Sequence, residues 1–370
     1  MTDPLQDRAA RAEFASTVRS SGHARTVNPA ANGVLKTSGP RPERVSQLRL
    51  VRHELNAGAK KSLRVMKFGG TSVGDASCIE RVVDIVRAAS HESDIAVVVS
   101  AMSGVTNQLV EAARQSEAGN HQMVADIFEE LRKRHEAALS ALVPSAERQR
   151  PIAGKIQNLL HEGNRLCQDA ILRCELTPRV RDAISGLGER LSVLLVAAAI
   201  AERGMPDEAI EATELVVTDS RHGAAEPHMD LTRERCEARL RPLLLRGVVP
   251  VVTGFIGATV EGVLTTLGRN SSDYSGTIMG AALGADEVVL WTDVDGILTA
   301  DPRLVPGARP IREMSYREAS DLADSGAKVL HAKALRIAME YGIPLSIRNT
   351  FAPERLGTTI APPALRAELE

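Results

Sequence analysis

Arg64-Val-Met-Lys-Phe-Gly-Gly-Thr-Ser72 is the stretch that decides the fold. An apolar strand over residues 63–68 ends here in a glycine-rich turn, and residues 79–89 have the pattern of an amphipathic helix. Glycines in such a turn let backbone N–H groups approach phosphate oxygens, and Lys67 adds a positive charge. Because the lysine precedes the glycines, this is not the P-loop motif. An ordinary turn after a strand is the simpler interpretation of this motif alone.

The same alternation of strand and helix continues along the chain. Apolar runs of strand length recur at residues 95–100, 214–218, 248–255, 287–291 and 344–347. Helical patterns are found at residues 121–142, 152–174 and 192–201, with a proline-containing break between the first two. Alternating strands and helices predict an α/β fold, a three-layer α/β/α sandwich with a mostly parallel central sheet.

Residues 1–62 differ from the rest in composition. They are rich in Arg, Ser, Ala and Pro and poor in large apolar residues, which predicts a largely disordered extension. A short helix is expected only over residues 44–57, where Val45, Leu48, Val51 and Leu55 recur at helical spacing. The folded domain is expected over residues 63–360, with a tail over residues 361–370.

Composition argues against several classes of partner. The 45 basic and 47 acidic residues nearly balance, and aromatic residues are only 2% of the chain, so nucleic acid and acidic membrane surfaces are not expected partners. The four cysteines form no C-x-x-C pair, and no histidine lies at metal-ligand spacing from them, so no metal ligands are expected. Without an apolar run of about 18 residues or a leader pattern, no membrane association and a cytoplasmic location are expected.

Two polar segments are expected at the edge of the sheet where α/β proteins bind ligands. Ser100-Ala-Met-Ser-Gly-Val-Thr-Asn107 follows the second strand, although Ser103 or Thr106 could instead cap the next helix. Gly186-Leu-Gly-Glu-Arg-Leu-Ser192 places Glu189 at a helix entrance. A carboxylate there could stabilise the helix through its dipole or bind a cationic partner such as a substrate ammonium group.

Gly268-Arg-Asn-Ser-Ser-Asp-Tyr-Ser275 is more specific. Arg269 can hold a carboxylate through two parallel hydrogen bonds. Asp273 and three serines gather at the start of a small-residue helix, which is more hydrogen-bonding capacity than a helix cap needs. The motif therefore indicates a binding site for a small acidic substrate.

The last two motifs lie further along the chain. In Trp291-Thr-Asp-Val-Asp-Gly-Ile-Leu-Thr-Ala-Asp-Pro-Arg303, Thr292 and Asp293 can bind a ribose or base edge and Arg303 can reach phosphates, although Asp-Gly and Asp-Pro turns would explain the backbone. Gly326-Ala-Lys-Val-Leu-His331 places Lys328 near a helix entrance. In this order, the motifs indicate a kinase that acts on a small molecule.

This set and order of motifs resembles the catalytic domain of aspartokinases, within the amino acid kinase family, over about residues 63–360. The resemblance implies ATP-dependent phosphorylation of the side-chain carboxylate of L-aspartate to 4-phospho-L-aspartate, in the biosynthesis of lysine, threonine and methionine. It also implies a homodimer, and Mg²⁺ held mainly through the ATP phosphates. The chain ends at Glu370, before the place where the family's ACT domains begin, so feedback regulation of that type is not expected.

The resemblance also implies roles for individual residues. The nucleotide would be bound by Lys67, Phe68, Gly69, Gly70, Thr292, Asp293, Leu298, Arg303 and Lys328. Aspartate would be bound by Thr106, Glu189, Arg269 and Ser272, with Arg269 on its α-carboxylate and Glu189 on its ammonium group. Lys67, Asp273 and Lys328 would be catalytic, because phosphoryl transfer needs positioning and charge stabilisation rather than a strong base.

One departure from the family leaves alternatives open. Asn270-Ser271 stands where the family usually has two glycines, which suggests a kinase of the same fold with a different small carboxylate as its substrate. A non-catalytic partner subunit is the other alternative. The full set of charged residues argues against it, because an inactive relative has no need of them.

Overall fold

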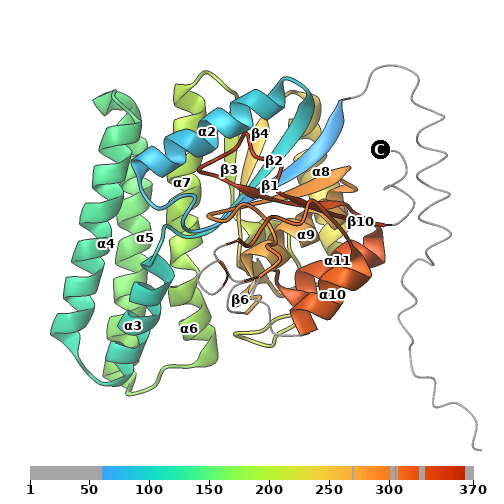
Figure 1. Ribbon diagram of the computed structural model, residues 1–370. Helices are drawn as coiled ribbons and strands as arrows, with labels where there is room; N and C mark the ends of the chain where they lie inside the picture. Colours follow the sequence, from blue (N-terminus) through green and yellow to red (C-terminus); the bar gives the residue numbers. More distant parts are fainter. Residues whose placement is uncertain (1–60, 269–270, 301–304, 306, 325–329, 363–370) are drawn as a thin grey trace, which may run out of the picture. The chain divides into compact units, whose positions relative to one another are not determined.

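The computed structural model describes residues 61–268, 271–300, 305, 307–324 and 330–362 (Figure 1). The sequence predictions for residues 1–60, including the helix over residues 44–57, lie outside the described residues. The same holds for Arg269, Arg303 and Lys328, and for most of the expected tail.

An eight-stranded sheet forms the centre of the fold, in the order β3-β4-β2-β1-β7-β9-β10-β8. Its strands are β1 (Ser62–Phe68), β2 (Ser93–Val99), β3 (Asp207–Ile210), β4 (Val249–Thr253), β7 (Glu287–Thr292), β8 (Glu313–Ser315), β9 (Leu345–Asn349) and β10 (Thr358–Ala361). All neighbouring strands pair in parallel except β9 and β10. A separate antiparallel hairpin consists of β5 (Ile256–Ala258) and β6 (Leu264–Thr266).

Helices cover both faces of the sheet, as the sequence predicts. One layer contains α2 (Ala76–Ser90), α3 (Val105–Glu117), α4 (His121–Leu142), α5 (Ala146–Arg173), α6 (Pro178–Ser185) and α7 (Leu187–Glu202). The other contains α8 (Met229–Leu245), α9 (Ser272–Leu283), α10 (Tyr316–Asp324) and α11 (Ala332–Tyr341). Alternate residues of β1 supply the two cores: Met66 and Phe68 face the first layer, and Leu63 and Val65 face the second. The three-layer α/β/α prediction is confirmed.

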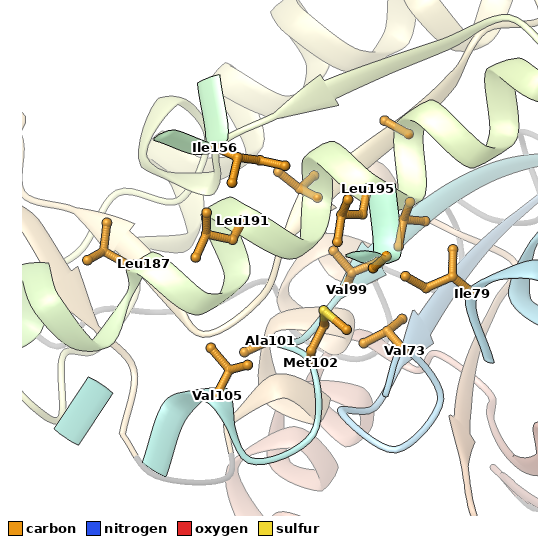
Figure 2. Close-up of a cluster of buried hydrophobic side chains, with 14 of the residues drawn as sticks. Val73, Ile79, Val99, Ala101, Met102, Val105, Ile156, Leu187, Leu191 and Leu195 are labelled. Carbon is orange, nitrogen blue, oxygen red and sulfur yellow. The ribbon is translucent and has the colours of Figure 1, made fainter. Parts of the chain in front are cut away.

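Helix α7 is the apolar centre of the first layer. Figure 2 shows Leu187, Leu191 and Leu195 of this helix packed among the buried residues of the neighbouring elements. The segment Pro178–Glu202 is apolar and long enough to cross a bilayer by length and composition alone. However, 83% of the apolar window is buried inside the fold, as expected of a core helix.

Two details of the sequence prediction are wrong. Residues 214–218 do not form a strand of the sheet: Ala212–Glu214 is a 3₁₀ turn, and Val217 forms only an isolated bridge to Ala258 of the hairpin. The apolar run is buried by contacts outside the sheet, which periodicity cannot distinguish from a strand. Helix α5 begins at Ala146, after its N-cap Ser145, and therefore contains Pro151. Pro151 lies in the second turn of α5, where it removes the hydrogen bond to the carbonyl of residue 147 but does not end the helix.

Candidate active site

The centre of the candidate site is an ion pair between Lys67 and Asp273. Lys67 stands near the end of β1 and is only 5% exposed, and its Nζ lies 2.5 Å from Oδ1 of Asp273 in the first turn of α9. Gly276 makes this contact possible, because a Cβ there would lie 2.9 Å from Cβ of Lys67. A buried ammonium group requires a counter-charge, and Asp273 supplies it. The structure thus brings together two of the three residues expected to be catalytic.

The glycine turn after β1 packs tightly against two neighbouring strand ends. Gly69 N–H donates to the carbonyl of Trp291 over 3.0 Å, and Ser72 Oγ lies 2.7 Å from Oγ1 of Thr350. A Cβ on Gly70 would lie 3.0 Å from the carbonyl oxygen of Ala101, so a side chain would crowd the turn. The backbone of this turn can therefore approach a ligand closely, as phosphate binding requires.

Glu189 is a buried carboxylate with a free oxygen. It lies in the first turn of α7, is 3% exposed, and its Oε2 has no hydrogen-bond partner among the described residues. Burial raises the pKa of this carboxyl to about 8, while a hydrogen bond from the backbone of Ala101 acts in the opposite direction. Buried polar atoms are rarely left without partners, so the free oxygen indicates a missing donor.

Gly188 explains why Glu189 lies so close to the loop after β2. A Cβ on Gly188 would lie 2.6 Å from Cβ of Ala101, a distance that real side chains do not tolerate. In the same loop, Thr106 is half-buried in the first turn of α3. The suggestion that Ser103 or Thr106 caps α3 is wrong, because Gly104 is the N-cap and no side chain caps the helix. The side chain of Thr106 is therefore not used as a cap of α3.

The start of α9 contains a second unpaired group. Ser271 Oγ is buried without a hydrogen-bond partner among the described residues, whereas Ser272 is half-buried. Ser275 Oγ accepts from the N–H of Phe255 over 2.8 Å and donates to the carbonyl of Ser271 over 3.2 Å. Phe255 has a φ of 64°, a conformation that costs free energy for a residue with a Cβ. Ser275 thus holds a strained backbone next to the candidate site.

Thr292 is the last residue of β7 and Asp293 follows it. Strand β7 pairs with β1 through Trp291 and Phe68. The side chains of Thr292 and Asp293 are half-buried and exposed, respectively, and Thr292 Oγ1 donates to Oδ1 of Asp293 over 3.2 Å. Leu298 lies beyond them and forms an isolated bridge with Pro310. Since the parallel strands β1 and β7 end at the same edge of the sheet, Thr292 and Asp293 lie on the same side as the glycine turn.

Comparison with known proteins identifies the family. The model of the amino acid kinase family matches residues 62–349. The chain belongs to the amino acid kinase family.

Among curated relatives of this amino acid kinase, lysine-sensitive aspartokinase 3 of Escherichia coli is 35% identical over 308 residues, which cover 82% of the chain and 66% of the relative. The chloroplastic aspartokinase 3 of Arabidopsis thaliana is 34% identical, with 83% of the chain and 54% of the relative covered. The chain therefore spans about half to two thirds of the length of these relatives.

Solved structures agree with this result. The structure of E. coli aspartokinase III in complex with aspartate and ADP is 33% identical to this chain, with a TM-score of 0.72. The alignment covers 81% of the chain and 64% of that structure. The resemblance to aspartokinase catalytic domains is confirmed.

The described residues contain no group of three or more His, Cys, Asp or Glu side chains that could hold a metal ion. A divalent ion at this site would therefore depend on oxygen ligands from the substrate. The ammonium group of Lys67, which is paired with Asp273, lies 3.6 Å from the position that a Cβ on Gly69 would occupy.

Some contacts of the site have no signal in the sequence. The strained Phe255 and the hydroxyl pair of Ser72 and Thr350 depend on segments that are far apart along the chain. Gly276 could have been found, because small residues recur on α9 where it packs against β1.

Proposed function

We propose that this protein is an aspartate kinase, which transfers the γ-phosphoryl group of ATP to the side-chain carboxylate of L-aspartate. The products are ADP and 4-phospho-L-aspartate. The observation that carries the proposal is the pairing of two features. The buried Lys67 lies beside a glycine turn suited to phosphates, and the buried Glu189 has a free oxygen suited to an ammonium group. The similarity to aspartokinases supports the choice of aspartate.

The acceptor needs no general base. The side chain of aspartate is already a carboxylate at neutral pH. One of its oxygens attacks the γ-phosphorus, the bond from phosphorus to the β,γ-bridging oxygen breaks, and ADP leaves with the electron pair. Asp273 is therefore free to act as the partner of Lys67. It holds the Lys67 ammonium group where negative charge develops in the transition state.

Nucleotide binding rests on the glycine turn. The backbone N–H of Gly70, with Lys67, would contact the phosphates, and Gly69, whose own N–H donates to Trp291, would let them approach because it has no side chain. Phe68, Thr292, Asp293 and Leu298 would contribute to the rest of the nucleotide site. Arg303 and Lys328 are proposed phosphate ligands from the family resemblance. Mg²⁺ held through the ATP phosphates would neutralise part of their negative charge. The free hydroxyl of Ser271 is a suitable donor to the same oxygens.

Aspartate binding rests on Glu189. Its free Oε2 would accept a hydrogen bond from the substrate ammonium group, which also repays the cost of burying a carboxylate. Thr106 and Ser272 are proposed to contact the substrate, and Arg269 is proposed to hold its α-carboxylate. A homodimer and a cytoplasmic location are proposals of the same kind.

The test is ATP consumption that depends on L-aspartate, with hydroxylamine present to trap the acyl phosphate as a hydroxamate. Succinate serves as a matched control, because it has two carboxylates but no ammonium group for Glu189. We expect hydroxamate with L-aspartate and none with succinate. Turnover with another carboxylate and none with L-aspartate would refute the substrate assignment but not the kinase chemistry.

A further inference from the structure

A second buried carboxylate, Asp182 of α6, is fully hydrogen-bonded and lies outside the residues assigned so far. It is 3% exposed. Its Oδ2 accepts from Nδ1 of His222 at 2.8 Å, from the N–H of Gly223 at 3.0 Å and from the N–H of Thr266 at 3.1 Å. Its Oδ1 accepts from Oγ1 of Thr266 at 2.7 Å. Both oxygens are satisfied within the protein, in contrast to Glu189, so Asp182 has no oxygen left for a ligand.

The four donors come from two segments that are distant from α6 in the sequence. His222 and Gly223 belong to the loop over residues 219–228, and Thr266 is the last residue of β6. A carboxylate that accepts from several buried donors fixes the relative positions of the segments that carry them. Asp182 therefore joins α6, this loop and β6.

Each joined segment leads directly into one wall of the proposed aspartate site. Helix α6 ends at Ser185, and after Gly186 the chain continues into the first turn of α7, which carries Glu189. Strand β6 ends at Thr266, six residues before Ser272, the proposed substrate contact at the start of α9. Asp182 thus connects the side of the site that carries Glu189 to the side that carries Ser272.

The loop over residues 219–228 makes further contacts that hold β6 and α9 in place. Ala225 N–H donates to the carbonyl of Thr266 over 2.9 Å, so the loop is bound to the end of β6 as well as to Asp182. Gly268 has a φ of 104°, and a Cβ there would lie 3.7 Å from the carbonyl oxygen of Gly223. At its other end the loop reaches α9, where Glu226 Oε2 accepts from the hydroxyl of Tyr274 over 2.9 Å.

We propose that Asp182 is a positioning residue that sets the spacing between the two walls of the aspartate site and thereby the affinity for the acidic substrate. This proposal rests on the proposed function. Within the described part of the chain, the hydrogen bonds of Asp182 run to His222, Gly223 and Thr266 and not to the glycine turn or Lys67. We therefore expect it to act on the acceptor side and to leave nucleotide binding unchanged. Displacement of a substrate ligand by about 1 Å can lower catalytic efficiency on the order of 100-fold.

Asp182→Asn is the direct test, because asparagine keeps the volume but replaces an acceptor with a donor. The amide nitrogen would face either the three N–H groups, which cannot accept from it, or the hydroxyl of Thr266, which can rotate to accept. In both orientations the negative charge that strengthens the remaining hydrogen bonds is lost. We expect the KM for L-aspartate to rise on the order of 10- to 100-fold. The KM for ATP should change less than about threefold, since the nucleotide side is not displaced.

Thr266 offers a matched pair of variants. Thr266→Val removes the hydroxyl donor at nearly constant volume, whereas Thr266→Ser keeps it. Valine should raise the KM for L-aspartate and serine should restore it to near the wild-type value. Thr232→Val is a control for a general loss of stability. Thr232 is buried and its hydroxyl accepts from the N–H of Val217, which lies just before the loop over residues 219–228. We expect it to lower the melting temperature without changing the ratio of the two KM values.

Nucleotide binding gives a second readout that does not require turnover. Trp291 is the only tryptophan of the chain, and its carbonyl accepts from Gly69 N–H in the glycine turn. Titration of each variant with MgADP, followed by tryptophan fluorescence, should give the wild-type Kd. A parallel rise of the MgADP Kd and of both KM values would mean that Asp182 is merely structural and would overturn the proposal.

Failure of the two proposals can be distinguished. If wild-type protein does not use L-aspartate, the proposed substrate is wrong, and the variants are compared with whichever carboxylate supports turnover. If wild-type protein uses L-aspartate and Asp182→Asn leaves its KM unchanged, the positioning role is wrong. Should Asp182→Asn not fold, the contrast between Thr266→Val and Thr266→Ser decides, and equal KM values in these two would refute the proposal.

Discussion

Nζ of Lys67 lies 2.5 Å from Oδ1 of Asp273, which joins the end of β1 to the first turn of α9 across 206 positions of sequence. The lysine side chain is almost fully buried and the aspartate is about one quarter exposed. The pair therefore places a fixed positive charge at the edge of the sheet, next to the glycine turn.

Substitution of either member should abolish most of the activity. Lys67→Met and Asp273→Asn are each expected to lower kcat by at least about 100-fold, because the lysine charge or its orientation is lost in the transition state. Each should also lower stability, since one partner remains buried without its counter-charge. The double variant should regain stability in thermal unfolding but stay inactive. Near-wild-type kcat in either single variant would refute the catalytic role.

Aspartate binding should depend on pH through Glu189. Burial raises the pKa of this carboxyl to about 8, so it is largely protonated below that pH in the free protein. Binding an ammonium group favours the carboxylate, and we expect the KM for L-aspartate to fall as pH rises from 6.5 to 8.5. Glu189→Gln should raise the KM and remove this pH dependence. A profile that is identical in wild-type and variant protein would exclude Glu189 as the source.

The same group should affect stability without ligand. Its pKa is raised on folding, so its contribution is fully present below the ordinary value of 4.5 and is lost as pH rises through about 8. Denaturant unfolding of wild-type protein and Glu189→Gln between pH 5 and pH 8 measures this. As pH rises, we expect the unfolding free energy of the wild-type protein to fall relative to that of Glu189→Gln.

Burial of His135 should make the stability of the protein fall at acid pH, the opposite of the effect of Glu189. It is fully buried in α4, where its Nδ1 lies 2.6 Å from the carbonyl oxygen of Leu131 and its Nε2 has no partner among the described residues. Burial lowers its pKa from 6.5 to about 4. Stability should therefore be lost as pH falls from about 6.5 towards 4, by up to roughly 3 kcal/mol. His135→Gln should show a shallower loss between these pH values in urea unfolding, and an unchanged slope would contradict the assignment.

Replacement of two helical glycines by alanine should have opposite effects on the protein. A Cβ on Gly188 would lie 2.6 Å from Cβ of Ala101, so Gly188→Ala should displace the start of α7 and raise the KM for L-aspartate through Glu189. Gly154 of α5 has open space around its Cα, so Gly154→Ala should stabilise the protein by roughly 0.5–1 kcal/mol. Thermal unfolding and aspartate kinetics of both variants give the comparison.

Local patterns in the sequence were sufficient for the central strands and for the helices next to them. Mainly apolar runs predicted β1, β2, β4, β7 and β9, because strands buried on both faces carry few polar side chains. The short strands β3, β8 and β10 gave no such signal. Strands β3 and β8 lie at the two edges of the sheet, and β10 pairs antiparallel with β9, so neighbouring strands rather than their own pattern determine their pairing.

The candidate site likewise has features that the sequence predicts and features that only the tertiary structure shows. Its residue types, and their places at strand ends and helix starts, could be predicted because glycine turns and polar helix starts are local features. Arg269, Arg303 and Lys328 stay predictions from the sequence. The ion pair of Lys67 with Asp273, the free oxygen of Glu189 and the four donors around Asp182 come only from the tertiary structure. Burial and hydrogen bonding between segments dozens to hundreds of residues apart depend on how the layers pack, and that packing leaves no periodic trace in the chain.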